Sequence, residues 1–154
     1  MIESLIGARA RFSSRSGSPV REPQKVVIHF IDHTLLKGHA RFFFHHQMQM
    51  LMQTLEGEER LVPFTEIKAV FFVRSFTGDR KRQEKKDFGP GSPRFGESVR
   101  VTFLDGETLI GRAVGYRPED RGFYFKPADP ESNNEIVYIP QGSVKEIVVG
   151  DLER

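Results

Sequence analysis

The chain contains no cysteine and no tryptophan. Without cysteine it has no disulfide framework, no thiolate nucleophile and no Cys-ligated zinc site, and a cytoplasmic setting fits this composition best. Its longest apolar runs, such as AVFFV (69–73), are far shorter than the roughly 20 residues that a membrane-spanning helix needs. The opening segment MIESLIGARARF is too short and too interrupted for a secretory signal. We therefore expect no membrane span.

Charge of both signs is plentiful but unevenly distributed. Of the 154 residues, 29% are charged and 38% are hydrophobic, which indicates a folded chain with one ordinary domain or two very small ones. Residues 1–96 hold 16 Lys and Arg against 10 Asp and Glu, whereas residues 97–154 hold 7 against 11. Such asymmetry occurs where one half binds nucleic acid, and also where two solvated surfaces differ in charge. The basic residues fall in segments expected to be flexible, which favours the second interpretation.

The stretch VRVTFLDGETLIGRAVGY (99–116) predicts a β-hairpin with an Asp-Gly turn, and VVIHFIDHTLLKGHARFF (26–43) resembles it at an offset of 73. Matching residues occupy alternate positions, as on the buried face of a strand: Val26 and Val99, Phe30 and Phe103, Leu36 and Leu109, Gly38 and Gly111. Further along the offset is 77, where FTEIKAVFFV (64–73) lies beside QGSVKEIVVG (141–150). Two copies of one supersecondary unit explain this order better than chance likeness of two hairpins.

Each copy predicts five short strands. In the first copy they cover about 25–31, 35–44, 47–53, 59–63 and 67–74, and in the second about 98–104, 107–116, 122–126, 135–140 and 144–149. A one-turn connector, PQGS in the second copy, precedes the last strand. This plan is typical of a small SH3-like or Sm-like barrel. We therefore expect an all-β chain with two tandem five-stranded barrels packed together.

The domain boundaries follow from composition. We expect a flexible basic arm at 1–24, barrels at 25–76 and 97–150, a charged Gly- and Pro-containing linker at 77–96, and a tail at 151–154. The predicted core residues are Phe30, Leu36, Ile67 and Val70 in the first barrel and Phe103, Leu109, Val144 and Ile147 in the second. Phe43, Phe72 and Tyr124 are expected to face outward and to be covered by the sister barrel, a partner or stacked bases.

Catalytic constellations are not evident. Five histidines, at positions 29, 33, 39, 45 and 46, raise the hypothesis of a metal site, but they fall on outward strand positions and in turns. The serines in the loops have no general base positioned to activate them. The paired carboxylates lie in turns, where exposure to solvent is the ordinary reason for charged residues. We expect a protein that is not an enzyme and has no metal and no cofactor.

The loop PADPESNNE (127–135) is the most polar connection in the second copy. Asn133 and Asn134 can both close local turns and both tolerate a left-handed backbone. Two interpretations stay open. The loop is a recognition tip, or it is a connection whose side chains satisfy its own backbone.

The second copy, VRVTFLDGETLIGRAVGY followed by VYIPQGSVKEIVV, resembles an Sm-like fold. Sm proteins bind uridine-rich RNA through an Asp and an Asn after the second strand and an Arg-Gly before the fifth. Here the Asp position is Arg117, the Asn position is Arg121 or Gly122, and the Arg-Gly position is Pro140-Gln141. The resemblance therefore implies the fold but not the RNA site.

Two further resemblances bear on function. Residues 25–150 are similar to a bacterial family of uncharacterised proteins, through IKAVFFVRSFTGD, DGETLIGRAVGY and GFYFKPADPESNNEIVYIP. The arm segment RFSSR partly resembles the arginine motif with which PilZ domains bind cyclic di-GMP, and places Arg11 and Arg15 ahead of the first strand. The expected function is a non-catalytic binding or scaffold module for a protein partner or for self-association. A nucleotide or nucleic acid is the alternative ligand. The candidate ligand-binding residues are Arg11, Arg15, Arg117, Arg121, Asn133 and Asn134.

Overall fold

The computed structural model describes residues 24–77, 96–113, 116–117, 119–129 and 131–150. The first half contains β2 (Gln24–Phe30), β3 (Leu35–Phe44), β4 (Gln49–Thr54), β5 (Glu59–Pro63), the 3-10 turn η1 (Phe64–Glu66) and β6 (Ile67–Val73). The second half contains β7 (Glu97–Phe103), β8 (Thr108–Ala113), β9 (Gly122–Pro127), β10 (Asn134–Pro140), η2 (Gln141–Ser143) and β11 (Val144–Val149). The all-β prediction is confirmed. No helix in the described part of the chain is long and apolar enough to cross a membrane.

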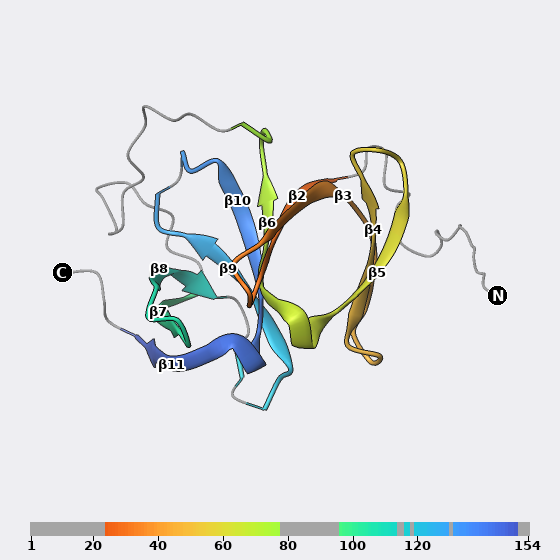
Figure 1. The fold of residues 1–154 in the computed structure, drawn as a ribbon. Helices are drawn as coiled ribbons and strands as arrows, with labels where there is room; N and C mark the ends of the chain where they lie inside the picture. The colour runs from red at the N-terminus through yellow and green to blue at the C-terminus, as the bar shows by residue number, and fades with distance from the viewer. Residues whose placement is uncertain (1–23, 78–95, 114–115, 118, 130, 151–154) are drawn as a thin grey trace, which may run out of the picture.

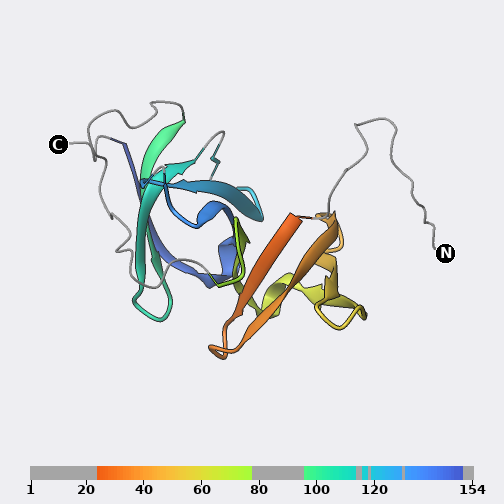
Figure 2. The same cartoon turned by 90° about the horizontal axis from the view of Figure 1, so that it is seen from above.

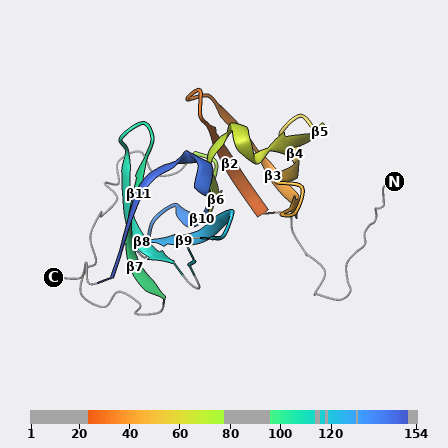
Figure 3. The ribbon, with the colours of Figure 1, turned by 90° about the horizontal axis from the view of Figure 1, so that it is seen from below.

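The ten strands form one open antiparallel sheet, in the order β11-β7-β8-β9-β10-β6-β2-β3-β4-β5. The sheet passes from one half to the other because β6 pairs with β2 on one side and with β10 on the other. Figures 1 and 2 show it curling into two rounded halves, with β6 and β10 running between them. Figure 3 shows the same arrangement from below. Among the described strands, β11 and β5 stand at the two edges of the sheet.

Each half of the sheet encloses an apolar core. The first core comprises Val26, Ile28, Met50, Met52, Val62, Phe64, Ile67, Val70, Phe72 and Tyr138, with Phe30 and Leu36 packed against it. The second core comprises Val27, Ala69, Phe71, Val73, Val99, Val101, Phe103, Ala113, Phe123, Phe125, Val137 and Ile139, with Leu109, Val144 and Ile147 packed against it. All eight predicted core residues therefore lie in or against the expected core.

Strand β6 contributes to both cores, and every one of its seven residues is buried. Phe72 faces the first core and Phe71 faces the second. The expectation that Phe72 faces outward is wrong. A strand inside a single barrel has one outer face, but β6 lies between two cores, which is why its residues 69–73 form a continuous apolar run rather than an alternating pattern.

The two halves share their strand-pairing pattern. Val26 pairs with Gly38 and Val99 with Gly111, at positions 73 apart. Both glycines are required by space, because a Cβ atom would lie 2.2 Å from a backbone oxygen of β4 at Gly38 and 2.1 Å from the Lys126 backbone oxygen at Gly111. The closing strands also correspond, because β6 pairs with β2 and β11 with β7.

A β-bulge occurs at the same place in both closing strands. Between β2 and β6 the register shifts at Lys68, and between β7 and β11 it shifts at Lys145, 77 residues later. A bulged residue has no partner directly opposite and aims its side chain differently from its neighbours. Lys68 is buried, whereas Lys145 lies on the edge strand and is exposed.

The two hairpin turns are built alike. Asp32 Oδ1 accepts a hydrogen bond from the Thr34 N–H at 3.0 Å, and Asp105 Oδ1 accepts one from the Glu107 N–H at 2.9 Å. The next residue is left-handed in both turns, with φ of 93° at Gly106 and 74° at His33. The first turn is therefore strained, because a residue with a Cβ takes a conformation that favours glycine.

The structure matches the expected strand positions to within a few residues, and η1 and η2 occupy the two expected one-turn connectors. The predicted arm 1–24, linker 77–96 and tail 151–154 lie outside the described residues, apart from Gln24, Thr77 and Gly96.

Candidate functional site

An exposed apolar face covers the outside of β3, β4 and β5. Phe42 pairs with Leu51, and Leu51 pairs with Leu61, so the three side chains form one row across three strands. Phe42 is 51% exposed and Leu61 is 56% exposed. The Phe44 ring lies 4.7 Å from the Phe42 ring, between centroids. We call Phe42, Phe44, Leu51 and Leu61 the β3–β5 face.

The sequence builds this face through a bulge in β3. The register between β3 and β4 shifts between Ala40 and Phe42, so the alternation of inward and outward side chains reverses there. Ala40 and Phe43 consequently pack against the first core, while Phe42 and Phe44 lie on the other side of the strand. The expectation that Phe43 faces outward is therefore wrong. Strict period-2 alternation would have placed Phe42 on the same side as Ala40.

The second half carries an aromatic pair at the equivalent place, and there one of its two members is covered, whereas Tyr124 stays 39% exposed. Tyr124 of β9 pairs with Tyr138 of β10, as Leu51 pairs with Leu61. Tyr138 is only 3% exposed, because Phe43 and Phe64 of the first half lie over it at centroid distances of 5.5 and 5.3 Å. Burial, with smaller effects of Tyr124 and Asp120, raises the pKa of Tyr138 to about 12.

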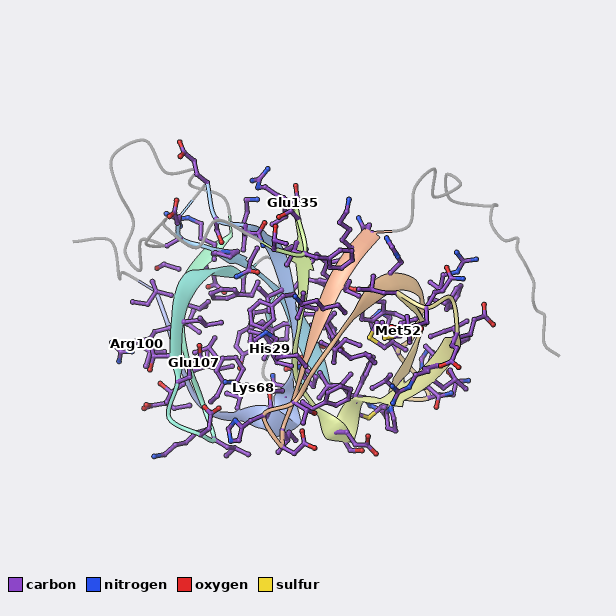
Figure 4. All side chains as sticks on the ribbon, turned by 45° about the horizontal axis from the view of Figure 1, so that its top comes forward. His29, Met52, Lys68, Arg100, Glu107 and Glu135 are labelled. Carbon is purple, nitrogen blue, oxygen red and sulfur yellow. The ribbon has the colours of Figure 1, made fainter. Side chains whose placement is uncertain are left out.

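Lys68 of β6 forms ion pairs with Asp105 and Glu107 of the second half, and we call these three residues the Lys68 group. The Lys68 ammonium donates to Asp105 Oδ2 at 2.7 Å and to a carboxylate oxygen of Glu107, and it lies 4.8 Å from the Phe103 ring centroid. Burial alone would lower the pKa of Lys68, but the two carboxylates outweigh it and raise that pKa. Asp105 responds in the opposite sense, because the hydrogen bond from Lys68 lowers its pKa. Figure 4 labels Glu107 in the second half of the sheet and Lys68 to its right, closer to the middle of the molecule.

His29 of β2 lies beside this group. Its ring centroid is 4.4 Å from that of Phe71, and Figure 4 labels it close to Lys68. Burial and then the positive charge of Lys68 lower the pKa of His29, while Glu107 opposes them. The neutral imidazole is therefore favoured, which suits packing against an aromatic ring more than proton transfer or anion binding.

The predicted ligand arginines of the second half already have partners within the chain. The Arg117 guanidinium lies 3.0 Å from Asp120 Oδ1, and Arg121 donates to the His46 backbone oxygen at 3.2 Å. Both side chains are exposed. The bond from Arg121 connects the residue before β9 to the turn between β3 and β4, and thus links the two halves.

Asn133 also holds the chain together. Its side-chain oxygen accepts from the Ser75 N–H at 3.1 Å, and its side-chain nitrogen donates to the Ser75 oxygen at 3.0 Å. The Asn134 N–H donates to Ser132 Oγ at 3.0 Å. The bond from Asn134 agrees with the interpretation of the loop as a connection that satisfies its own backbone, whereas Asn133 binds the backbone of a different segment. The remaining two predicted ligand residues, Arg11 and Arg15, lie outside the described residues.

Within the described residues, no group of three or more His, Asp or Glu side chains is placed to hold a metal ion. His29 and His39 lie on β2 and β3, and His33 lies in the turn between them. His45 and His46 lie in the turn between β3 and β4.

A family model described as a family of unknown function, DUF6982, matches residues 22–150. The chain belongs to this family. The match runs from β2 to β11 and therefore includes the β3–β5 face, the Lys68 group and the Asn133 loop. No curated protein and no solved structure matches the chain. The prediction that the chain belongs to a family without a known function is confirmed.

Sequence patterns did not identify the β3–β5 face, because Leu51 and Leu61 look like ordinary strand residues. The useful signal was RFFF (41–44), where three consecutive aromatics cannot all face one core. The Lys68 group could have been suspected from the paired lysines at 68 and 145, since a lysine inside an apolar strand normally has a carboxylate partner.

Proposed function

We propose that the chain is a non-catalytic binding or scaffold module that mediates protein–protein interaction through the β3–β5 face. The observation that carries the proposal is the exposed row Phe42–Leu51–Leu61. Scattered exposed apolar residues are ordinary on protein surfaces, but a contiguous row on a regular sheet marks a contact surface. A protein partner covers such a row with apolar side chains, whereas a charged ligand gains little from it.

We further propose that residues 25–76 and 97–150 are two copies of one SH3-like or Sm-like unit, joined edge to edge in the shared sheet. The equivalent glycines, turns and bulges of the two halves support this interpretation. The pair Tyr124–Tyr138 then corresponds to the pair Leu51–Leu61, and Tyr138 is covered within the chain where Leu61 is exposed. The same surface is used within the chain in one copy and is available to a partner in the other.

Cyclic di-GMP and nucleic acid remain the alternative ligands, and neither is favoured by the described residues. Arg117 and Arg121 already bind Asp120 and the His46 backbone oxygen, and the described residues around them form no evident phosphate-binding arrangement. Binding through Arg11 and Arg15 would depend on the arm and predicts a different response to substitution from that of the β3–β5 face.

The proposal is tested by affinity capture from an extract of the source organism with three full-length baits. These are the parent chain, the double variant Phe42→Asp/Leu61→Asp, and the control Leu104→Asp, which changes a 62% exposed leucine outside the face. We expect proteins retained by the parent and the control to be lost from the face variant. Each captured protein is then purified and titrated against the three baits.

Calorimetric titration of cyclic di-GMP and of a mixed single strand at two salt concentrations tests the alternatives, with Arg11→Ala/Arg15→Ala alongside. Non-specific nucleic-acid binding weakens steeply with salt. Tight dinucleotide binding that needs the two arginines, or capture that is indifferent to the β3–β5 face, would overturn the proposed function.

A further inference from the structure

We propose that the chain associates head to tail with further copies of itself, with the β11 edge of one copy pairing with the β5 edge of the next. The inference rests on the proposed function and names the partner of the β3–β5 face. Among the described residues, no further strand pairs with the outer edge of β5 or of β11, and each of these strands carries an exposed apolar residue, Leu61 on β5 and Val149 on β11. Unpaired edges are ready templates for strand addition.

The pairing of β10 with β6 inside the chain is the template for this contact between chains. There β10 pairs antiparallel with β6, with Ile136 opposite Phe72, Val137 opposite Phe71 and Tyr138 opposite Val70. Strand β5 is the first-half equivalent of β10, and β11 is the second-half equivalent of β6, both at the offset of 77. The same register between chains places Glu59, Arg60 and Leu61 opposite Val149, Val148 and Ile147.

The apolar surfaces agree with this arrangement. Within the chain, Tyr138 belongs to the first core together with Phe72, and it is buried there. The equivalent residues at the open edges are Leu61 and Val149, which are exposed in a single chain. Pairing the edges would bury Leu61 and Val149, together with the part of the β3–β5 face around Leu51.

Charge complementarity agrees as well. In the internal junction the bulged Lys68 reaches Asp105 Oδ2, while Asp105 Oδ1 caps its own turn. The equivalent residues are the bulged Lys145 on β11 and Asp32, whose Oδ1 caps the other turn. Both are exposed. The arrangement therefore directs Lys145 of one copy toward Asp32 Oδ2 of the next.

The contact between chains is more polar than the internal one. Glu59 and Arg60 stand where β10 has Ile136 and Val137, so we expect reversible association rather than a permanent complex. A head-to-tail contact joins different surfaces of the two copies. It produces a closed ring where the rotation between copies closes and an open fibre where it does not.

The test is sedimentation velocity on the full chain from about 1 to about 200 µM, which brackets the affinities of reversible contacts. Four samples are compared with the parent: Lys145→Glu, Asp32→Lys, an equimolar mixture of the two, and the control Lys25→Glu in the middle of the sheet. Each single variant places like charges opposite each other, and we expect the association constant to fall by about tenfold or more. Circular dichroism checks that each variant is folded.

The equimolar mixture of the two variants tests whether Lys145 of one copy contacts Asp32 of the next. The side chain introduced by Lys145→Glu meets the one introduced by Asp32→Lys in the next copy. The unchanged Lys145 of the second variant meets the unchanged Asp32 of the first, so every alternating contact is again complementary. We expect the mixture to regain the parent's association and the control to keep it. A monomeric parent throughout the range, single variants that associate like the parent, or a mixture of folded variants without rescue would each overturn the proposal.

The two proposals fail differently. A monomeric chain that still captures other proteins through Phe42 contradicts self-association and leaves the proposed function standing. Loss of every interaction that depends on the β3–β5 face, with other proteins and with itself, contradicts both.

Discussion

Lys68 of β6 donates a 2.7 Å hydrogen bond to Asp105, which lies 37 residues later in the turn between β7 and β8. This contact, together with the pairing of β6 with β10, ties the two halves of the sheet into one structure. The lysine is buried, but both of its carboxylate partners reach solvent, and the balance between its burial and its partners determines what the group contributes.

Replacing Lys68 with Met is expected to lower the free energy of unfolding by about 2 kcal/mol. Hydrogen bonds to charged groups contribute about 1.5–3 kcal/mol, and the two carboxylates can hydrate only in part when the ammonium is lost. Urea unfolding followed by circular dichroism measures the change. Lys25→Met, at an exposed lysine of β2, is the control and should stay within about 0.5 kcal/mol of the parent. Equal effects of the two substitutions would contradict a structural role of the Lys68 group.

His29 should make the protein less stable in mild acid. Burial lowers the pKa of His29 in the folded chain, so below its ordinary value near 6.5 the unfolded chain binds more protons than the folded one. The free energy of unfolding therefore falls as the pH drops from about 6.5 through the folded pKa. His45, whose pKa is lowered by burial and by His46, acts in the same direction.

The variant His29→Gln removes one of these two contributions. Urea unfolding between pH 7.5 and pH 5 should give a shallower decrease in stability for the variant than for the parent. Parallel pH profiles would show that the environment of His29 is not the one described.

Adding a methyl group at Gly38 or Gly111 should be costly. In both cases the new Cβ would lie little more than 2 Å from a backbone oxygen of the neighbouring strand, which cannot move without disturbing the sheet. We expect Gly38→Ala and Gly111→Ala each to destabilise the fold by about 1–3 kcal/mol. Gly142→Ala, where a Cβ meets nothing within 4 Å, is the matched control and should be nearly neutral. Thermal unfolding of the three variants gives the comparison directly.

The residues that follow the aspartate in the two hairpin turns, His33 and Gly106, can be exchanged by substitution. His33 holds a left-handed backbone with φ of 74°, so His33→Gly should raise the free energy of unfolding by about 0.5–1 kcal/mol, after the entropy that glycine adds to the unfolded chain. Gly106→His should lower it by a similar amount. Denaturant unfolding measures both, and changes of the same sign would show that the turns are not equivalent.

Much of the fold was predictable because alternation and turn residues are local signals. The Asp-Gly turn at 105–106, the 3-10 connector at 141–143 and the alternating strand at 99–103 are each determined by neighbouring residues. The cores followed from the same alternation, since Phe30, Ile67 and Val70 recur at the offsets of the second copy.

Other features could not be predicted because they depend on contacts between distant segments. Burial of Phe72 requires β6 to lie between two cores, which a single-strand pattern does not reveal. Asn133 binds Ser75, 58 residues away, and Arg121 binds the His46 backbone, 75 residues away. The bulge before Phe42 reverses an alternation that the sequence otherwise maintains, and so conceals the exposed face.

The central claim is that the β3–β5 face contacts another protein, and photo-crosslinking tests it most directly. The photoreactive residue p-benzoylphenylalanine is placed at Phe42 in one full-length chain and at Leu104 in a second, and both are irradiated in cells of the source organism. The account predicts a protein adduct, including one to a second copy of the chain, from position 42 and none from position 104. An adduct only to nucleic acid, or equal crosslinking from both positions, would contradict it.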